Sequence, residues 1–262
     1  MKKLSEITHP IVVELAQFED FFAQNLKAET EPMDSIMRYV GETRGKRLRP
    51  TLLLLCARLF GEANEQTLRA AAFVEMVHSA TLIHDDVVDD SDERRGRASV
   101  QSQFGHLSAV LAGDYLLAKA MLLLSQPADS TILQEMLRTT AAMSEGELMQ
   151  NASFCRHGRQ NDAYLDIITR KTALLMCSCC VAGALSVHAT LEQVRQISDF
   201  GLNFGILFQL RDDLLDGENM EQAQALLPSY YEKTLRALNG FENNAIVEAL
   251  GELTVFCAER EG

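Results

Sequence analysis

Residues that interrupt a chain are scarce in this sequence. Five prolines and fifteen glycines are spread over 262 residues, and no tract of low complexity or rich in serine and glycine separates one part from another. No repeat period is present either. Without a linker or a shift in composition, the sequence predicts a single domain that spans residues 1–262.

Basic residues are also few relative to acidic ones. Lysine and arginine total 24 against 37 aspartates and glutamates, which gives a formal net charge of −13. A chain this acidic is unsuited to a general affinity for nucleic acid or for an anionic membrane surface. An anionic substrate would therefore have to be held by local basic residues and by a metal ion.

Signals for export or membrane insertion are missing too. Residues 1–6 lack the apolar core of a signal peptide, and the longest nearly apolar run, residues 107–124, contains Asp114 and Lys119. We expect this run to be a buried core helix. The sequence thus predicts a cytoplasmic protein with no transmembrane segment.

Six cysteines show none of the spacings of a disulfide framework. Cys177, Cys179 and Cys180 are close in sequence, but on a helix they point in different directions and no second Cys or His pair completes a tetrahedral set. This pattern disfavours zinc. We expect small buried thiols in a reducing compartment.

Apolar residues recur at intervals of three and four, and no stretch alternates with a period of two. This periodicity predicts an all-α fold, a bundle of about ten helices. The predicted helices cover residues 11–26, 33–42, 48–60, 65–90, 106–125, 130–154, 161–186, 190–216, 221–239 and 243–259.

An acidic cluster ends one of these helices. Asp85 and Asp89 lie one turn apart on one helical face, and Asp86 flanks them. A second cluster with the same spacing, Asp212, Asp213 and Asp216, ends another helix. Carboxylates are poorly placed at the negative end of a helix dipole, and hard oxygen ligands suit Mg²⁺. Two solvated helix ends are the alternative.

Basic residues gather at two places. Gly45, Lys46 and Arg49 belong to a loop before a predicted helix, where cations and free backbone N–H groups favour an anion. Arg94 and Arg95 follow the first acidic cluster and match the geometry of phosphate oxygens. A solvated basic loop is the alternative for the first group.

Other polar residues on these helices are less informative alone. His78 lies two turns before Asp85 and could line the same cavity or be a core histidine. Lys171 interrupts an apolar helix and either reaches solvent or meets a buried anion. We expect Glu145, Glu147 and Gln150 to form a solvated face, although Gln150 could point inward.

These motifs together resemble those of the trans-isoprenyl diphosphate synthases, or polyprenyl synthetases, over about residues 30–216. The matching segments are Gly45 to Pro50, His78 to Asp89, Arg94 to Gly96, Ala112 to Leu116, Lys171-Thr172 and Phe208 to Asp213. The resemblance implies helices around a central apolar cavity, a homodimer, and Mg²⁺-dependent condensation of isopentenyl diphosphate with an allylic diphosphate.

The resemblance also implies a role for each matching residue. Lys46, Arg49, His78 and Arg95, on the loop with Gly45, would hold the diphosphate of isopentenyl diphosphate. Mg²⁺ on the allylic diphosphate would be bound by Asp85, Asp86, Asp89, Asp212, Asp213 and Asp216, assisted by Arg94 and Lys171. Thr172 and Gln209 would face the reacting carbons.

In this family, product length depends on what fills the cavity beneath the first cluster. Ala80 and Thr81 stand where short-chain members often carry an aromatic residue. Small side chains one turn from Asp85 would leave a tunnel open. By resemblance, the product is therefore expected to be of medium or long chain length.

One departure from the family pattern follows residue 216. The family continues with a lysine-bearing segment, whereas no lysine or arginine follows Arg211 until Lys233. The allylic diphosphate would then lack one cation. This keeps open a catalytically impaired regulatory partner of an active synthase. A class I terpene cyclase is a further alternative, although such enzymes need no second diphosphate site.

Overall fold

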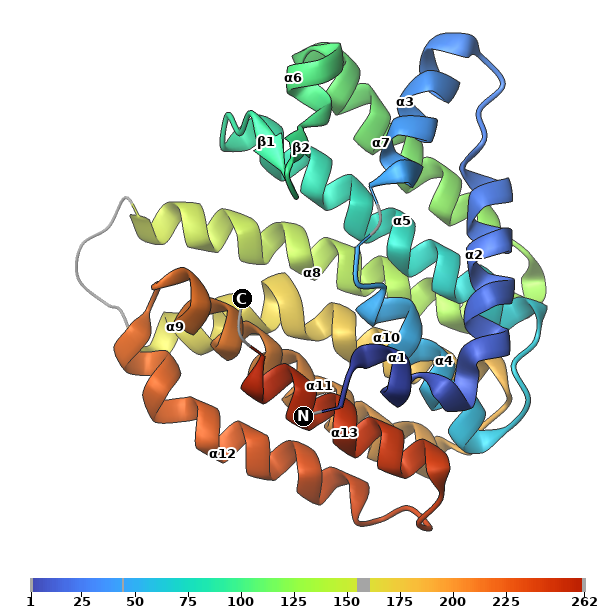
Figure 1. Cartoon of the computed structure of the whole chain (residues 1–262), viewed down its shortest axis with the longest axis vertical. Helices are drawn as coiled ribbons and strands as arrows, with labels where there is room; N and C mark the ends of the chain where they lie inside the picture. Colours follow the sequence, from blue (N-terminus) through green and yellow to red (C-terminus); the bar gives the residue numbers. More distant parts are fainter. Residues whose placement is uncertain (1, 44, 155–160, 261–262) are drawn as a thin grey trace.

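The computed structural model describes residues 2–43, 45–154 and 161–260, and it confirms the all-α prediction (Figure 1). The only strands within these ranges form a short antiparallel hairpin, β1 (Glu93–Arg94) and β2 (Arg97–Ala98). The helices are α1 (Leu4–Ile7), α2 (Val12–Leu26), α3 (Glu31–Glu42), α4 (Leu48–Phe60), α5 (Glu65–Val88), α6 (Val100–Phe104), α7 (His106–Leu123), α8 (Ser130–Phe154), α9 (Asn161–Ile168), α10 (Leu174–Ser186), α11 (Leu191–Asp216), α12 (Met220–Leu238) and α13 (Ala245–Glu259).

The two helices that carry the acidic clusters have well-defined starts. Asn64 caps α5 by accepting a hydrogen bond from the backbone N–H of Thr67, and Thr190 caps α11 by accepting one from Gln193. Helix α11 ends at Gly217, whose φ of 73° suits the left-handed conformation of a C-terminal cap. Both clusters therefore lie in the last turn of a long helix, as predicted.

Helix α10 is the centre of the bundle. Residues 175–184 are all buried, and α10 packs against α4, α5, α8 and α11. Gly183 allows the close approach of α4, because a Cβ there would lie 2.3 Å from the carbonyl oxygen of Leu53. Cys177, Cys179 and Cys180 are buried free thiols in this helix, and burial raises the pKa of Cys177 to about 11. Cys155 lies outside the described residues.

Helix α7 is not the buried core helix that the sequence predicted. Leu107 is 75% exposed and Leu122 is 70% exposed, and Val110 and Leu111 are also exposed on the same face. The prediction was wrong because the run is apolar on both faces, whereas α7 buries only the face that meets α5.

Two helical segments have the length and hydropathy of a membrane span, namely residues 106–123 and 163–186. The second contains α10 and is mostly packed inside the protein. Length and composition alone do not separate such core helices from true spans.

Candidate active site

A π-helical turn, Thr169–Ala173, joins α9 to α10 and packs against α8 and the acidic helix α11. The wider turn displaces Lys171 and Thr172 from the regular helical register, as π turns at functional sites often do. Gly146 of α8 permits this packing, because a Cβ there would lie 2.7 Å from the backbone nitrogen of Lys171. Lys171 thus reaches toward the first cluster, and Thr172 toward the second.

Glu147 of α8 lies beside the first cluster, although the sequence analysis did not single it out for the site. Burial, and next the charge of Glu147, raise the pKa of Asp85 to about 6. Lys171 Nζ lies 2.6 Å from Glu147 Oε2 and donates a 2.9 Å hydrogen bond to Gln150 Oε1. The prediction of a solvated face was therefore wrong for Glu147, and the hydrogen bond of Gln150 to Lys171 fits the alternative that Gln150 points inward. Glu145 pairs with Arg170 at the surface.

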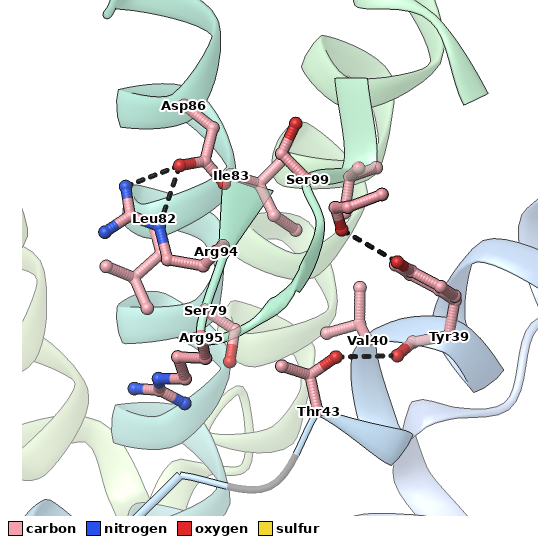
Figure 2. Close-up of a pocket in the computed structure, with 12 residues that line it drawn as sticks. Tyr39, Val40, Thr43, Ser79, Leu82, Ile83, Asp86, Arg94, Arg95 and Ser99 are labelled. Carbon is pink, nitrogen blue, oxygen red and sulfur yellow. Dashed lines mark hydrogen bonds and ion pairs between the residues drawn. The ribbon is translucent and has the colours of Figure 1, made fainter. Parts of the chain in front are cut away.

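Asp86 differs from its two neighbours in the cluster. It is buried, and its Oδ1 accepts a 2.8 Å hydrogen bond from Nε of Arg94 on the β1–β2 hairpin. Figure 2 shows this pair beside a small cavity that Tyr39, Val40 and neighbouring residues also line. Asp86 thus anchors the hairpin through Arg94. The metal role of Asp86 stays a prediction.

The second cluster divides in a similar way. Asp213 is buried and accepts hydrogen bonds from Tyr164 Oη at 2.6 Å and from Gln209 Nε2 at 2.7 Å. Thr172 Oγ1 donates to Gln209 Oε1 at 2.7 Å. This network fixes Thr172 and Gln209 in place through Asp213, and the metal role of Asp213 stays a prediction. Tyr164 was missed because nothing in its local sequence marks it as the partner of a residue 49 positions away.

Asp212 and Asp216 are less enclosed than Asp213. Asp216 is exposed, whereas burial raises the pKa of Asp212 despite an ion pair with Arg260. Arg260 comes from the residue after α13, far from α11 in the sequence. It is a site residue that the sequence analysis missed, because only the tertiary packing of α13 against α11 brings it there.

The basic loop lines a cavity of about 490 Å³. The structure brings together there the five residues predicted for one diphosphate, which are Gly45, Lys46, Arg49, His78 and Arg95. The guanidinium of Arg95 lies directly against Gly45, where a Cβ would be 2.4 Å from its Nη1. Residue 44 lies outside the described ranges.

Arg47, on the same loop, stabilises the loop through two ion pairs. It adopts a positive φ of 51° just before α4, and its guanidinium bonds Glu75 at 2.6 Å and Glu19 at 2.9 Å. These two ion pairs hold the loop against α2 and α5. Burial, and then the charges of Arg49 and Arg95, lower the pKa of His78 well below its usual range. His78 therefore serves this cavity as a neutral hydrogen-bonding group.

Ala80 and Thr81 occupy different faces of α5. Ala80 is fully buried one turn before His84, whose ring packs on Gly113 of α7. Thr81 is half-buried one turn before Asp85 and so shares the face of the first cluster. Of the two predicted chain-length residues, the geometry favours Thr81 as the one beside the reacting end.

The carboxylates of the first cluster fit a hard divalent cation. Asp85 and Asp89 are carboxylates one turn apart, and the raised pKa of Asp85 reflects a burial of charge that a cation would relieve. Within the described residues, no three acidic, histidine or cysteine side chains already converge as a metal site. Mg²⁺ is usually held by one or two carboxylates together with substrate phosphates, and the pair Asp85 and Asp89 would fit such an ion.

Comparisons with known proteins agree with this geometry. Residues 30–224 match the family model described as "Polyprenyl synthetase". The chain is 37% identical over 185 residues to octaprenyl diphosphate synthase of Haemophilus influenzae, covering 71% of this chain and 56% of that one. It is 36% identical to geranylgeranyl diphosphate synthase of Sulfolobus acidocaldarius, covering 79% of this chain and 68% of that one.

Solved structures show the same fold. A polyprenyl synthase from Caulobacter crescentus, complexed with calcium and isoprenyl diphosphate, superposes with a TM-score of 0.92 at 25% identity and covers 99% of this chain and 98% of its own. The chain spans only 56% to 66% of the length of several curated relatives.

Proposed function

This chain belongs to the polyprenyl synthetase family, and we propose that it condenses isopentenyl diphosphate with an allylic diphosphate to give a trans-polyprenyl diphosphate. The proposal rests on one observation, which is that a basic site and an acidic site lie next to each other. A basic cavity at Lys46 and Arg49 adjoins the acidic helix α11, because Arg260 lines that cavity and pairs with Asp212. A terpene cyclase has no need of the basic cavity.

The side chains suit an ionisation at the allylic carbon. Mg²⁺, when bound at Asp85, Asp89 and Asp212, would supply fixed positive charge to the departing diphosphate. Lys171 adds a cation that this chain itself provides beside Asp85. Thr172 and Gln209, held by Asp213, present a fixed polar surface. The carbocation would need an apolar lining that excludes water.

The proposal is tested by incubating the protein with isopentenyl and farnesyl diphosphates and Mg²⁺ and separating the products by length. Extended polyprenyl diphosphates are expected. Release of a cyclic hydrocarbon would instead indicate a terpene cyclase. Substrate binding without turnover, restored when an active synthase is added, would indicate a regulatory partner.

Product length should respond to Thr81 more than to Ala80. We propose a product of medium or long chain length, because Thr81 places a small, half-buried side chain on the Asp85 face of α5. Thr81→Phe should shorten the main product by several isoprene units, measured by chromatography of the dephosphorylated alcohols. Ala80→Phe is the matched control, and overpacking its closed environment should cost about 1–3 kcal/mol of stability. An unchanged product ladder in Thr81→Phe would reject this assignment.

We also propose that the protein is a cytoplasmic homodimer without a membrane span. The five free buried thiols within the described residues suit a reducing compartment. The exposed face of α7 supplies an apolar stripe, Leu107, Val110, Leu111 and Leu122, suited to a second copy.

The dimer is tested by one charged substitution. Leu111→Glu should convert a dimer into a monomer in sedimentation velocity, because the interface would bury an unpaired carboxylate. Leu191→Glu, at an exposed leucine at the start of α11 and outside the stripe, is the control and should remain dimeric. A monomeric wild-type protein would contradict the proposal.

A further inference from the structure

Arg260 is an arginine with unused hydrogen-bonding capacity inside the basic cavity. It is only 8% exposed and lines the cavity together with Lys46, Arg49 and Arg95. Its Nη2 pairs with Asp212 and also lies 3.4 Å from the carbonyl oxygen of Phe208. Its Nε is buried without a hydrogen-bond partner, and no described residue bonds its Nη1. Buried donors of this kind in a native fold call for a ligand.

The side chain is held in this position from several directions. The guanidinium stacks 4.2 Å above the ring centroid of Phe208, and the carbonyl oxygen of Arg260 accepts hydrogen bonds from Arg211 Nε at 3.0 Å and Nη2 at 2.6 Å. An arginine fixed by its stem and by one edge keeps its other edge available for an anion. The end of α13 is thus anchored to α11 with its cation at the cavity.

A second orphaned donor supports the same ligand chemistry. Nε of Arg49 is also buried without a partner among the described residues, and it lines the same cavity. Arg49 and Arg260 come from α4 and from the end of α13, so two distant parts of the chain leave guanidinium N–H groups unpaired at one place. An oxyanion with several acceptor oxygens would satisfy both, whereas a neutral ligand would not offset the concentrated positive charge.

We propose that Arg260 is a ligand of the diphosphate in this cavity, a cationic contact supplied by the C-terminal helix beyond those that the loop and α5 contribute. Its pairing with Asp212 also makes it the direct link between the two diphosphate sites. This inference rests on the proposed function for the identity of the substrate, isopentenyl diphosphate. The anion-binding role itself follows from the cavity.

The test is calorimetric binding of isopentenyl diphosphate and, separately, of inorganic pyrophosphate, with no metal added. Arg260→Gln should weaken both by about 10- to 100-fold, since a charge-assisted hydrogen bond is lost. Arg260→Lys should bind with intermediate affinity, because it keeps the charge but loses the planar fork. Arg236→Gln, an equal change of charge on the exposed face of α12, is the control and should bind as wild type.

Thermal unfolding of each variant separates binding from folding. Unchanged affinity in Arg260→Gln, with or without a lower melting temperature, would show that Arg260 is only a structural contact and would overturn the inference. If the wild-type protein binds pyrophosphate but not isopentenyl diphosphate, the proposed function fails while the role of Arg260 is still decided by its variants. Binding of neither ligand by wild type would overturn both.

Discussion

Asp85→Asn should lower turnover by about 10³-fold or more, since it removes a charged ligand at the point where a leaving diphosphate must be stabilised. The same change should raise the melting temperature. Asp85 is partly buried next to Glu147, and this environment raises its pKa to about 6. Ionisation of this carboxylate therefore destabilises the folded protein. Asparagine has the same shape without the charge. Loss of activity with a gain in stability is typical of a residue retained for function.

The pH dependence has a definite sign. The pKa of Asp85 is raised on folding from its usual value near 3.8 to about 6, so the folded state binds more protons than the unfolded state between these values. The contribution of Asp85 to stability therefore falls as pH rises from about 4 to about 6 and is constant above that range. Asp85→Asn should remove this component from the pH profile of unfolding.

The control is Asp86→Asn. Asp86 accepts a hydrogen bond from Arg94, so neutralising Asp86 should lower the stability of the fold. Steady-state assays at several Mg²⁺ concentrations and thermal unfolding from pH 4 to pH 8 measure both effects. Turnover by Asp85→Asn equal to that of wild type would show that the first cluster is only a solvated helix end.

The bundle and much of the site could be predicted from sequence because their signals are local. Helical periodicity is set by neighbours three and four residues apart, and caps such as Asn64 and Thr190 lie beside the helices that they start. The two aspartate clusters and the loop at Lys46 are likewise short motifs. Each can be read from a few adjacent residues, whatever the tertiary structure.

Contacts between residues that are distant in sequence could not be predicted in this way. Asp86 and Asp89 are both acidic members of one motif, and only the position of the hairpin shows that Asp86 turns toward Arg94. Helix α7 has apolar residues all round, so its sequence gives no sign of which face meets α5. Arg260 enters the site through the packing of α13, and no pattern near the end of the chain indicates it.

The lack of a lysine or arginine directly after the second cluster makes Lys171 important. Helix α11 ends at Asp216 and α12 begins at Met220, and no lysine or arginine occurs between Arg211 and Lys233. Arg94 is paired with Asp86, and Arg260 belongs to the basic cavity of the other diphosphate. Lys171 is the cation that the π turn brings to Asp85. Its loss therefore leaves the allylic diphosphate with metal as its main source of positive charge.

Lys171→Gln should reduce kcat/KM for the allylic diphosphate by about 10²-fold, the scale expected for one charged donor to a developing oxyanion. The KM for isopentenyl diphosphate should change little, because Lys171 does not line the basic cavity. Arg170→Gln removes the same charge one residue away, where Arg170 pairs with Glu145 and Asp166 at the surface, and should behave as wild type. Equal losses in the two variants would mean that the π turn matters only for folding.

Glu147→Gln tests whether Glu147 competes with the allylic diphosphate for Lys171. Lys171 is shared between Glu147 and Gln150, and a diphosphate must compete with Glu147 for it. Neutralising Glu147 leaves Gln150 to orient the ammonium group and removes the competing charge, so the KM for the allylic diphosphate should fall. If Glu147→Gln is instead as impaired as Lys171→Gln, then Glu147 is required to position Lys171, and the pair acts as one unit.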